Sequence, residues 1–179
     1  MIYLFLANGF EEIEALCPLD LLRRAGLEVT TVGIGGEMIT GSHGITVQAD
    51  IPDGLYADNA PDMIILPGGM PGSKNLDASR TVDAAIKAAL RKDAYIAAIC
   101  AAPFVLGKRG VLNGKEAICY PGFENELTGA RISNQKVVRD GKIITAAGMG
   151  VALEFGLKLV EAMTDAATAE RLRGSLQCR

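Results

Sequence analysis

Short apolar runs alternate along the chain with longer segments in which apolar residues recur at helical spacing. The longer segments predict amphipathic helices, at residues 11–25, 79–90 and 151–163. The short runs predict buried strands, at residues 2–6, 27–32, 63–66, 95–99 and 116–120. Strands that alternate with helices indicate a mostly parallel sheet with helices on both faces, a doubly wound α/β fold.

Two further pairs of short strands are typical of hairpins. The first pair, residues 38–40 and 45–49, surrounds a loop that contains His43. The second, residues 137–138 and 143–145, flanks Asp140 and Gly141.

Length, charge and composition favour a single domain and argue against nucleic-acid and membrane partners. The length of 179 residues, without a Pro-rich linker or a repeat, favours one domain over residues 1–179. A net charge of -3 and the lack of a dense Lys/Arg cluster argue against a nucleic-acid partner. No apolar run approaches the roughly 18 residues that span a bilayer, so no membrane partner is expected. The apolar start lacks a basic leader and meets Glu11 and Glu12 at once, so we expect a cytoplasmic protein.

The cysteines and the one histidine do not have the spacing of a metal site or a disulfide framework. We therefore expect free thiols and no metal, with Cys17 on the apolar side of a helix and Cys178 exposed near the end. The other two of the four cysteines are Cys100 and Cys119. His43 lies among glycines and a serine, which favours a solvated turn, so a cysteine–histidine dyad would have to recruit His43 or form between subunits.

Cys100 stands where a predicted strand runs into a short helix-like segment. Such a turn projects its residue from the carboxyl edge of the sheet and aims backbone N–H groups at it, so the thiol is expected to ionise easily. Alanines on both sides of Cys100 suit a tight nucleophile elbow. The alternative is a small buried cysteine without chemistry, and this stretch alone does not decide between the two.

In a doubly wound fold the ligand site lies beyond the carboxyl ends of the strands. The residues that follow the predicted strands form one candidate site: Asn8 to Glu14, Gly68, Gly69, Cys100, Ala101, Tyr120, Pro121 and residues 148–150. The two glycines would let backbone N–H groups approach an oxyanion, although a plain turn explains them too. No phosphate-loop pattern is present, so nucleotide cofactors have no support. Glu11 and Glu14 would share a helix face, and either helix capping or a raised pKa beside a thiol could be their role.

Several of these motifs, in this order, resemble the DJ-1/ThiJ/PfpI family, and most closely its DJ-1 branch. The matching segments are residues 8–14, 23–26, 66–69, 97–103, 148–150 and 153–155. The resemblance covers nearly the whole chain. It implies a flavodoxin-like sheet, a cytosolic homodimer, a reactive Cys100 and a protonated Glu14 beside it. It also implies an oxyanion pocket formed by the N–H groups of Gly69 and Ala101.

Two positions depart from the family's patterns. Tyr120 stands where many DJ-1 members have a histidine, and its phenol, with a reference pKa of about 10, is a poor base at neutral pH. The protease-like branch has a histidine directly after the nucleophile, whereas this chain has Ala101, which argues against a cysteine peptidase or amidase.

Two function classes follow from the resemblance. The first is an enzyme without cofactors that converts small 2-oxoaldehydes such as methylglyoxal to lactate, as the family's glyoxalase III and deglycase activities imply. Its catalytic residues would be Cys100 and Glu14, and Gly68, Tyr120 and Asn8 would contact the substrate. The second is a redox-sensing stress protein or chaperone in which Cys100 is oxidised to a sulfinate that Glu14 stabilises.

Overall fold

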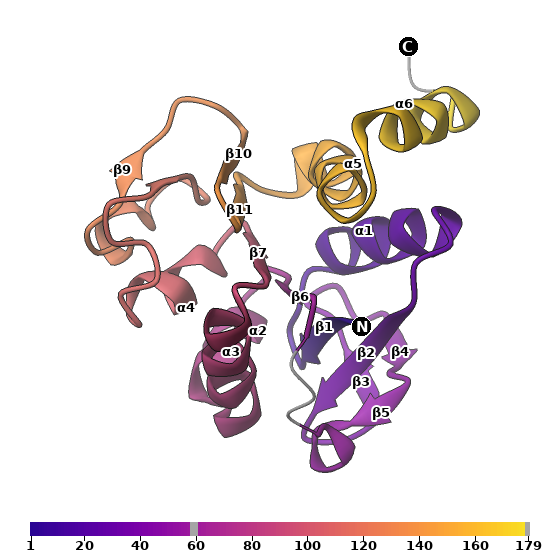
Figure 1. Cartoon of the computed structure of the whole chain (residues 1–179). Coiled ribbons are helices and arrows are strands. Elements are labelled where there is room, and N and C mark those ends of the chain that lie inside the picture. Colours follow the sequence, from indigo (N-terminus) through magenta and orange to yellow (C-terminus); the bar gives the residue numbers. More distant parts are fainter. Residues whose placement is uncertain (58–60, 178–179) are drawn as a thin grey trace.

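The computed structural model describes residues 1–57 and 61–177 and contains a mixed sheet at its centre (Figure 1). Its seven strands lie in the order β10-β11-β7-β6-β1-β2-β5. All neighbours are parallel except β10 and β11, which form the predicted antiparallel hairpin. The strands are β1 (Ile2–Ala7), β2 (Val29–Ile34), β5 (Ile51–Pro52), β6 (Met63–Leu66), β7 (Tyr95–Ile99), β10 (Val137–Asp140) and β11 (Ile143–Ala146).

Helices cover both faces of this sheet, as predicted (Figure 1). One face packs against α1 (Glu12–Arg24), α5 (Ala152–Met163) and α6 (Ala166–Ser175). The other face packs against α2 (Gly72–Ala78), α3 (Arg80–Lys92) and α4 (Pro103–Gly107). The architecture is therefore the doubly wound α/β class that the alternation of strands and helices indicated.

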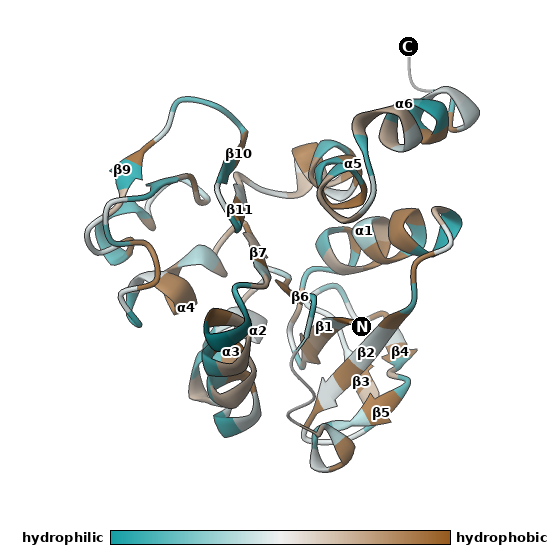
Figure 2. Cartoon of the chain, in the orientation of Figure 1, coloured by the Kyte–Doolittle hydropathy of each residue, from teal (hydrophilic) through white to brown (hydrophobic). Residues whose placement is uncertain are grey.

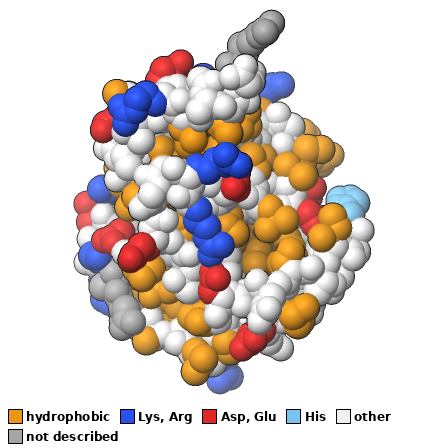
Figure 3. Space-filling view, turned by 90° about the vertical axis from the view of Figure 1, so that its right-hand side faces the viewer, with side chains coloured by type: hydrophobic (Ala, Val, Ile, Leu, Met, Phe, Trp, Pro, Cys, Tyr) orange, Lys and Arg blue, Asp and Glu red, His pale blue; other side chains and the backbone are white. Residues whose placement is uncertain are grey.

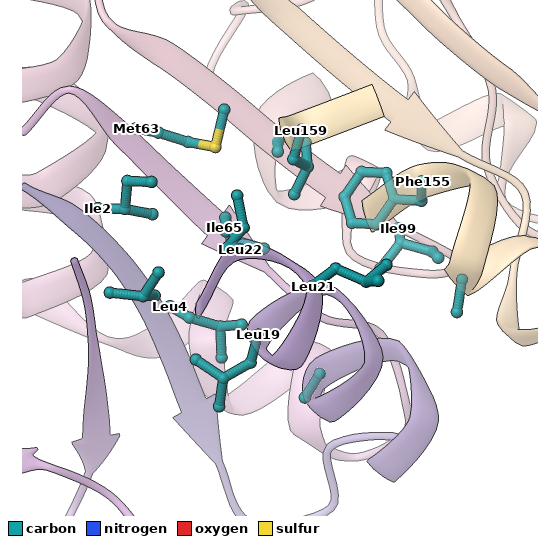
Figure 4. Close-up of a cluster of buried hydrophobic side chains, with 14 of the residues drawn as sticks. Ile2, Leu4, Leu19, Leu21, Leu22, Met63, Ile65, Ile99, Phe155 and Leu159 are labelled. Atoms are coloured by element: carbon teal, nitrogen blue, oxygen red, sulfur yellow. The ribbon is translucent and has the colours of Figure 1, made fainter. Parts of the chain in front are cut away.

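The central strands are buried on both sides, which explains why they read as continuous apolar runs. In β1, Ile2 and Leu4 enter the core under α1 and α5, whereas Tyr3 and Phe5 enter the core under α3. Figure 4 shows the first of these cores, where side chains of the sheet meet Leu22 and Phe155 of the covering helices. Figure 2 shows that the central strands are mostly hydrophobic, whereas each covering helix carries both hydrophobic and hydrophilic residues.

Side-chain caps fix where α1, α3 and α6 begin, and the carboxylate of Asp165 caps α6. The carboxylate of Glu11 accepts a hydrogen bond from the backbone N–H of Glu14 at the start of α1, with an N–O distance of 2.7 Å. The hydroxyl of Ser79 accepts one from the N–H of Val82 at the start of α3. Each cap satisfies a donor that the first turn of a helix leaves without a partner.

Four departures from the predicted elements concern the chain between and after the main strands. The predicted strand 116–120 is only β8 (Glu116–Ala117), which pairs with β9 (Arg131–Ile132). Beyond it the chain turns to other partners, since the N–H of Tyr120 donates to the carbonyl of Cys100. Helices α2 and α6 and strand β5 were not predicted.

The remaining elements are short. Strands β3 (Met38–Thr40) and β4 (Thr46–Gln48) form the predicted hairpin around His43. Single turns of 3-10 helix lie at η1 (Asp53–Leu55), η2 (Glu124–Glu126) and η3 (Met149–Val151). Among the described residues, none of the helices has the length and apolar character that crossing a bilayer requires.

Candidate active site

Cys100 occupies a sharp turn between β7 and α4. Its backbone has a φ of +63°, a left-handed conformation that residues other than glycine rarely adopt. The N–H of Ala102 donates to the carbonyl of Ile99 across the turn, and Pro103 begins α4 directly afterwards. The predicted elbow is therefore present, and its strained backbone is of the kind that clusters at functional sites.

Two backbone hydrogen bonds hold this turn to neighbouring segments. The N–H of Cys100 donates to the carbonyl of Ala146 at the end of β11, and its carbonyl accepts from Tyr120 at 2.7 Å. Ala101 and Ala102 are buried, so the predicted need for small neighbours is met. Cys100 itself is partly exposed.

Glu14 approaches Cys100 from the first turn of α1. It is only 1% exposed, and its Oε2 atom has no hydrogen-bond partner among the described residues. A Cβ built on Gly68 would lie 2.2 Å from this oxygen and 2.5 Å from the Cβ of Cys100. The two side chains therefore converge above Gly68, and only a glycine leaves room for both.

The environment of Glu14 favours its neutral form. Burial raises the pKa of Glu14 from its ordinary 4.5 to about 7, and the charge of Glu11 acts in the same direction. Hydrogen bonds with the Cys100 thiol and with the N–H groups of Gly68 and Met149 oppose this rise without cancelling it. A carboxyl with a pKa near 7 can both accept and donate a proton at neutral pH.

The expectation that the thiol of Cys100 ionises easily is not met. Burial raises the pKa of Cys100 to about 12, and the charge of Glu14 and its hydrogen bond to the thiol add to the rise. The N–H groups of Ala101 and Gly69 do lower the pKa, in the predicted direction, but burial and the carboxylate outweigh them. The thiol of Cys100 is therefore held in its protonated form at neutral pH.

The backbone N–H groups of Gly69 and Ala101 both act on the sulfur of Cys100. Gly69 has a φ of +89°, and a Cβ there would lie 2.3 Å from the backbone nitrogen of Glu11, so this close approach requires glycine. The structure thus brings Gly68, Gly69, Ala101 and Glu14 together around Cys100. Their roles in binding and catalysis remain predictions.

Tyr120 and Asn8 are more exposed to solvent than the residues around Cys100. Tyr120 is 52% exposed, and its ring lies against Gly148, where a Cβ would be 3.3 Å from its Cδ2 atom. The side chain of Asn8 accepts a hydrogen bond from the N–H of Thr40 and so holds the β3–β4 hairpin. Contact of either residue with a substrate remains a prediction.

Glu12 and His43 form a pair that the sequence did not reveal. The backbone N–H of His43 donates to Oε1 of Glu12 at 2.8 Å, and the ring Nδ1 lies 2.9 Å from Oε2. Burial alone would raise the pKa of Glu12, but these hydrogen bonds hold it below its ordinary value, and the pKa of His43 is raised in return. His43 therefore lies in the exposed turn that the sequence predicted, and it also holds a buried carboxylate, which the sequence did not predict.

Ligand atoms of Glu11, Glu12 and His43 lie within 4.8 Å of one another, a spacing that would suit a metal ion. The hydrogen bonds just described already satisfy Glu12, and Glu11 caps α1, so the helix and the loop account for this cluster.

The other cysteines differ in their surroundings. Cys119 is buried and burial raises its pKa to about 11, whereas Cys17 is partly buried and packs against the core under α1. Cys178, which was expected to be exposed, lies outside the described residues.

The chain is similar in sequence and in structure to proteins of one known family. The model of the DJ-1/PfpI family matches residues 1–162. The chain is 39% identical to "Protein dj-1beta" of Drosophila melanogaster over 87% of this chain and 85% of that protein. It is 32% identical to "Glutathione-independent glyoxalase DJR-1.2" of Caenorhabditis elegans over 86% and 82% of the two chains.

A solved structure, "Toxoplasma gondii DJ-1, oxidized", superposes with a TM-score of 0.94 at 34% identity, covering 98% of this chain and 97% of that one. The match includes the mixed sheet and the helices on both of its faces. This chain therefore belongs to the DJ-1/PfpI family, in its DJ-1 branch.

Proposed function

We propose that the protein converts small 2-oxoaldehydes, such as methylglyoxal, to 2-hydroxy acids with Cys100 as the nucleophile. The observation that carries the proposal is the buried carboxyl of Glu14, with a pKa near 7, beside a partly exposed thiol at a strained elbow. Such an arrangement joins a nucleophile to a base poised at neutral pH. Every step below uses groups of this chain, the substrate and water.

In the first step the thiol sulfur attacks the aldehyde carbon while the thiol proton passes to the carboxylate of Glu14. A C–S bond forms, and the C=O π electrons move to oxygen. The N–H groups of Gly69 and Ala101, which already act on the sulfur, would donate to this oxyanion. Glu14 then returns the proton to the oxygen, and the product is a hemithioacetal.

In the second step Glu14, again a carboxylate, removes the proton from the former aldehyde carbon and delivers it to the neighbouring ketone carbon. The hydroxyl of the hemithioacetal passes its proton to the former ketone oxygen and becomes a carbonyl. The former ketone is then a hydroxyl, so the product is a thioester of the 2-hydroxy acid. Water cleaves this thioester and releases lactate and the thiol. The sum is methylglyoxal plus water giving lactate, with no external oxidant or reductant.

The relative named as a glutathione-independent glyoxalase supports this choice of reaction. A deglycase activity, in which the substrate is a hemithioacetal or aminocarbinol already formed on another molecule, would use the same sulfur and the same proton acceptor.

Lactate formation tests the proposal. Purified wild type and Cys100→Ala are incubated with methylglyoxal in the absence of glutathione, and lactate is measured enzymatically. We expect turnover by the wild type and only background with Cys100→Ala, with Cys17→Ala as the control that retains turnover. Equal lactate from wild type and Cys100→Ala would remove the proposal.

A second candidate function is redox sensing, in which peroxide oxidises Cys100 to a sulfinate and protonated Glu14 donates a hydrogen bond to it. The favouring observations are the partial exposure of Cys100 and the similarity to a DJ-1 protein in an oxidized form. Mild peroxide followed by peptide mass mapping tests it. Oxidation of Cys17, Cys119 or Cys178 before Cys100 would contradict it.

We also propose a homodimer, formed through the face around the start of α1. Figure 3 shows this face, where hydrophobic side chains gather beside His43. Ile13, Met38 and Ile45 are 49%, 61% and 55% exposed, and the Ile45 N–H lies 3.4 Å from Oε1 of Glu12, next to Ile13. Light scattering should give twice the 18.8 kDa of one chain for wild type and for Leu55→Asp, and a lower mass for Ile13→Asp. A monomeric wild type would overturn this proposal.

The cytoplasm is the compartment we propose. Cys100 and Cys119 are free thiols, which suits a reducing environment.

A further inference from the structure

A hollow lies at the opposite end of strand β7 from Cys100. Tyr95 begins this strand and Cys100 follows its last residue, so about 17 Å of strand separates the two places. The hollow has a volume of about 600 Å³, within the range of small-molecule sites. Tyr95 and Lys142 also line an adjoining hollow of about 290 Å³.

Two cations meet on the ring of Tyr95 at this place. The Nζ atom of Lys142 lies 4.1 Å from the ring centroid, and the Cζ atom of Arg139 lies 5.2 Å from it. Arg139 also donates from Nη2 to the Tyr95 hydroxyl at 2.7 Å. Contacts of this kind hold a guanidinium and an ammonium group in fixed positions beside one half-buried ring.

A third cation, Lys115, lies beside the tight turn between β10 and β11. Gly141 has a φ of +64°, and a Cβ there would lie 3.6 Å from the Nζ atom of Lys115. The hairpin therefore places Arg139 and Lys142 on either side of a glycine that Lys115 approaches from another segment. All three side chains line the hollow.

Among the described residues, the cations that line this hollow outnumber the acidic groups beside them. Lys115 has a carboxylate partner, Asp140, at 3.5 Å. Within residues 1–57 and 61–177, no carboxylate forms a salt bridge with Arg139 or Lys142. Asp93 is the single acidic residue in the lining, against three cations, in a chain whose net charge is -3.

We propose that this hollow binds a small phosphorylated compound. The guanidinium of Arg139 donates from Nη2 to Tyr95 and from Nε to the carbonyl of Gly141, so its Nη1 group would donate to a phosphate oxygen. The two ammonium groups supply further positive charge at short range. Leu90, Val111 and Ile143 line the same hollow and offer an apolar wall to the organic part of a phosphate ester. The site lies at the other edge of the sheet from Cys100, so it stands apart from the proposed aldehyde chemistry.

Calorimetric titration with inorganic phosphate and with glycerol phosphate tests this site. We expect saturable binding to the wild type and roughly tenfold weaker binding for each of Arg139→Gln and Lys142→Gln, since one charge-assisted contact is lost in each. Lys142→Arg keeps the charge and should retain affinity, and Lys74→Gln, an exposed lysine on α2, is the matched control. Tighter binding of the ester assigns a role to the apolar wall, and equal binding assigns the site to the phosphate group alone.

Two results would overturn the proposal. One is the absence of saturable heat with either compound up to about 10 mM, a concentration that detects even weak sites. The other is equal affinity in wild type, Arg139→Gln and Lys142→Gln. Thermal unfolding of each variant separates loss of the ligand from loss of the fold, and lactate formation is expected to be unchanged in all of them.

Discussion

The carboxyl of Glu14 and the thiol of Cys100 occupy the same small space above Gly68, although they come from opposite halves of the chain. Their meeting depends on two strand ends, because β1 leads into α1 and β7 leads into the elbow at the same edge of the sheet. The consequence is a coupled pair: burial raises the pKa of Glu14 to about 7, and burial together with the charge of Glu14 raises the pKa of Cys100 to about 12.

Replacement of Gly68 tests the geometry of this meeting. A Cβ in Gly68→Ala would collide with Glu14 and Cys100 at 2.2 and 2.5 Å. We expect a loss of about 1–3 kcal/mol in the free energy of unfolding, and loss of lactate formation, because one of the two side chains must move. Gly174→Ala in α6, where a Cβ meets no atom within 4 Å, is the control. It should keep lactate formation and lose no stability, with a gain of up to about 1 kcal/mol because alanine favours a helix more than glycine does. Full activity in Gly68→Ala would show that the close approach is not needed.

Glu14→Gln is expected to stabilise the protein while it removes activity. A folded-state pKa above the ordinary 4.5 means that the folded protein holds this proton more tightly than the unfolded chain. Ionisation therefore costs no stability below about pH 4.5, and the cost grows until the pH passes about 7. At about pH 8 the variant should unfold with a free energy higher by on the order of 3 kcal/mol, and at about pH 4 with an unchanged one.

Urea unfolding of wild type and Glu14→Gln at the two pH values measures this difference. A variant that is less stable than wild type at alkaline pH would contradict the raised pKa.

The pairing of Glu12 with His43 predicts a titration that a single probe can follow. Because His43 is the one histidine in the chain, its ring gives one set of NMR signals. Its pKa is raised by the hydrogen bond and the charge of Glu12, so Glu12→Gln should lower it. The stability from this pair should be present below about pH 6.5 and be lost as the pH rises through the folded-state pKa of His43. Glu37→Gln, at an exposed position, is the control. Equal titration curves in wild type and Glu12→Gln would mean that the pair does not form in solution.

The central strands and the elbow could be predicted because their sequence signals are local. A strand that is buried on both sides has an unbroken run of apolar residues, as residues 95–99 do. The small alanines after Cys100 indicate a tight turn. The helix Gly72–Ala78 gave no such signal, since it begins with a glycine and buries Leu76 as its one large side chain. The helix Ala166–Ser175 buries only Ala169, so it lacks an apolar stripe.

The candidate site was predictable as a set of residues but not as an environment. In a doubly wound fold the carboxyl ends of the parallel strands lie at one edge of the sheet. Cys100, Gly69 and Glu14 follow such strand ends, so the sequence could predict that they lie together. The pKa of the thiol could not, because it depends on how far burial and the charge of Glu14 outweigh two backbone N–H groups. The partnership of Glu12 and His43 was likewise hidden, since a hairpin fold brings them together across 31 residues.

The reactivity of Cys100 as a function of pH tests most directly whether it shares a proton with Glu14. Alkylation by iodoacetamide is followed by peptide mass mapping of Cys100 in wild type and in Glu14→Gln, between about pH 5 and 10. Loss of one proton from the pair should give the wild type a rise in rate centred near pH 7, the pKa of Glu14, and Glu14→Gln should lack this rise. Identical profiles in the two proteins would contradict the shared proton and, with it, the proposed chemistry.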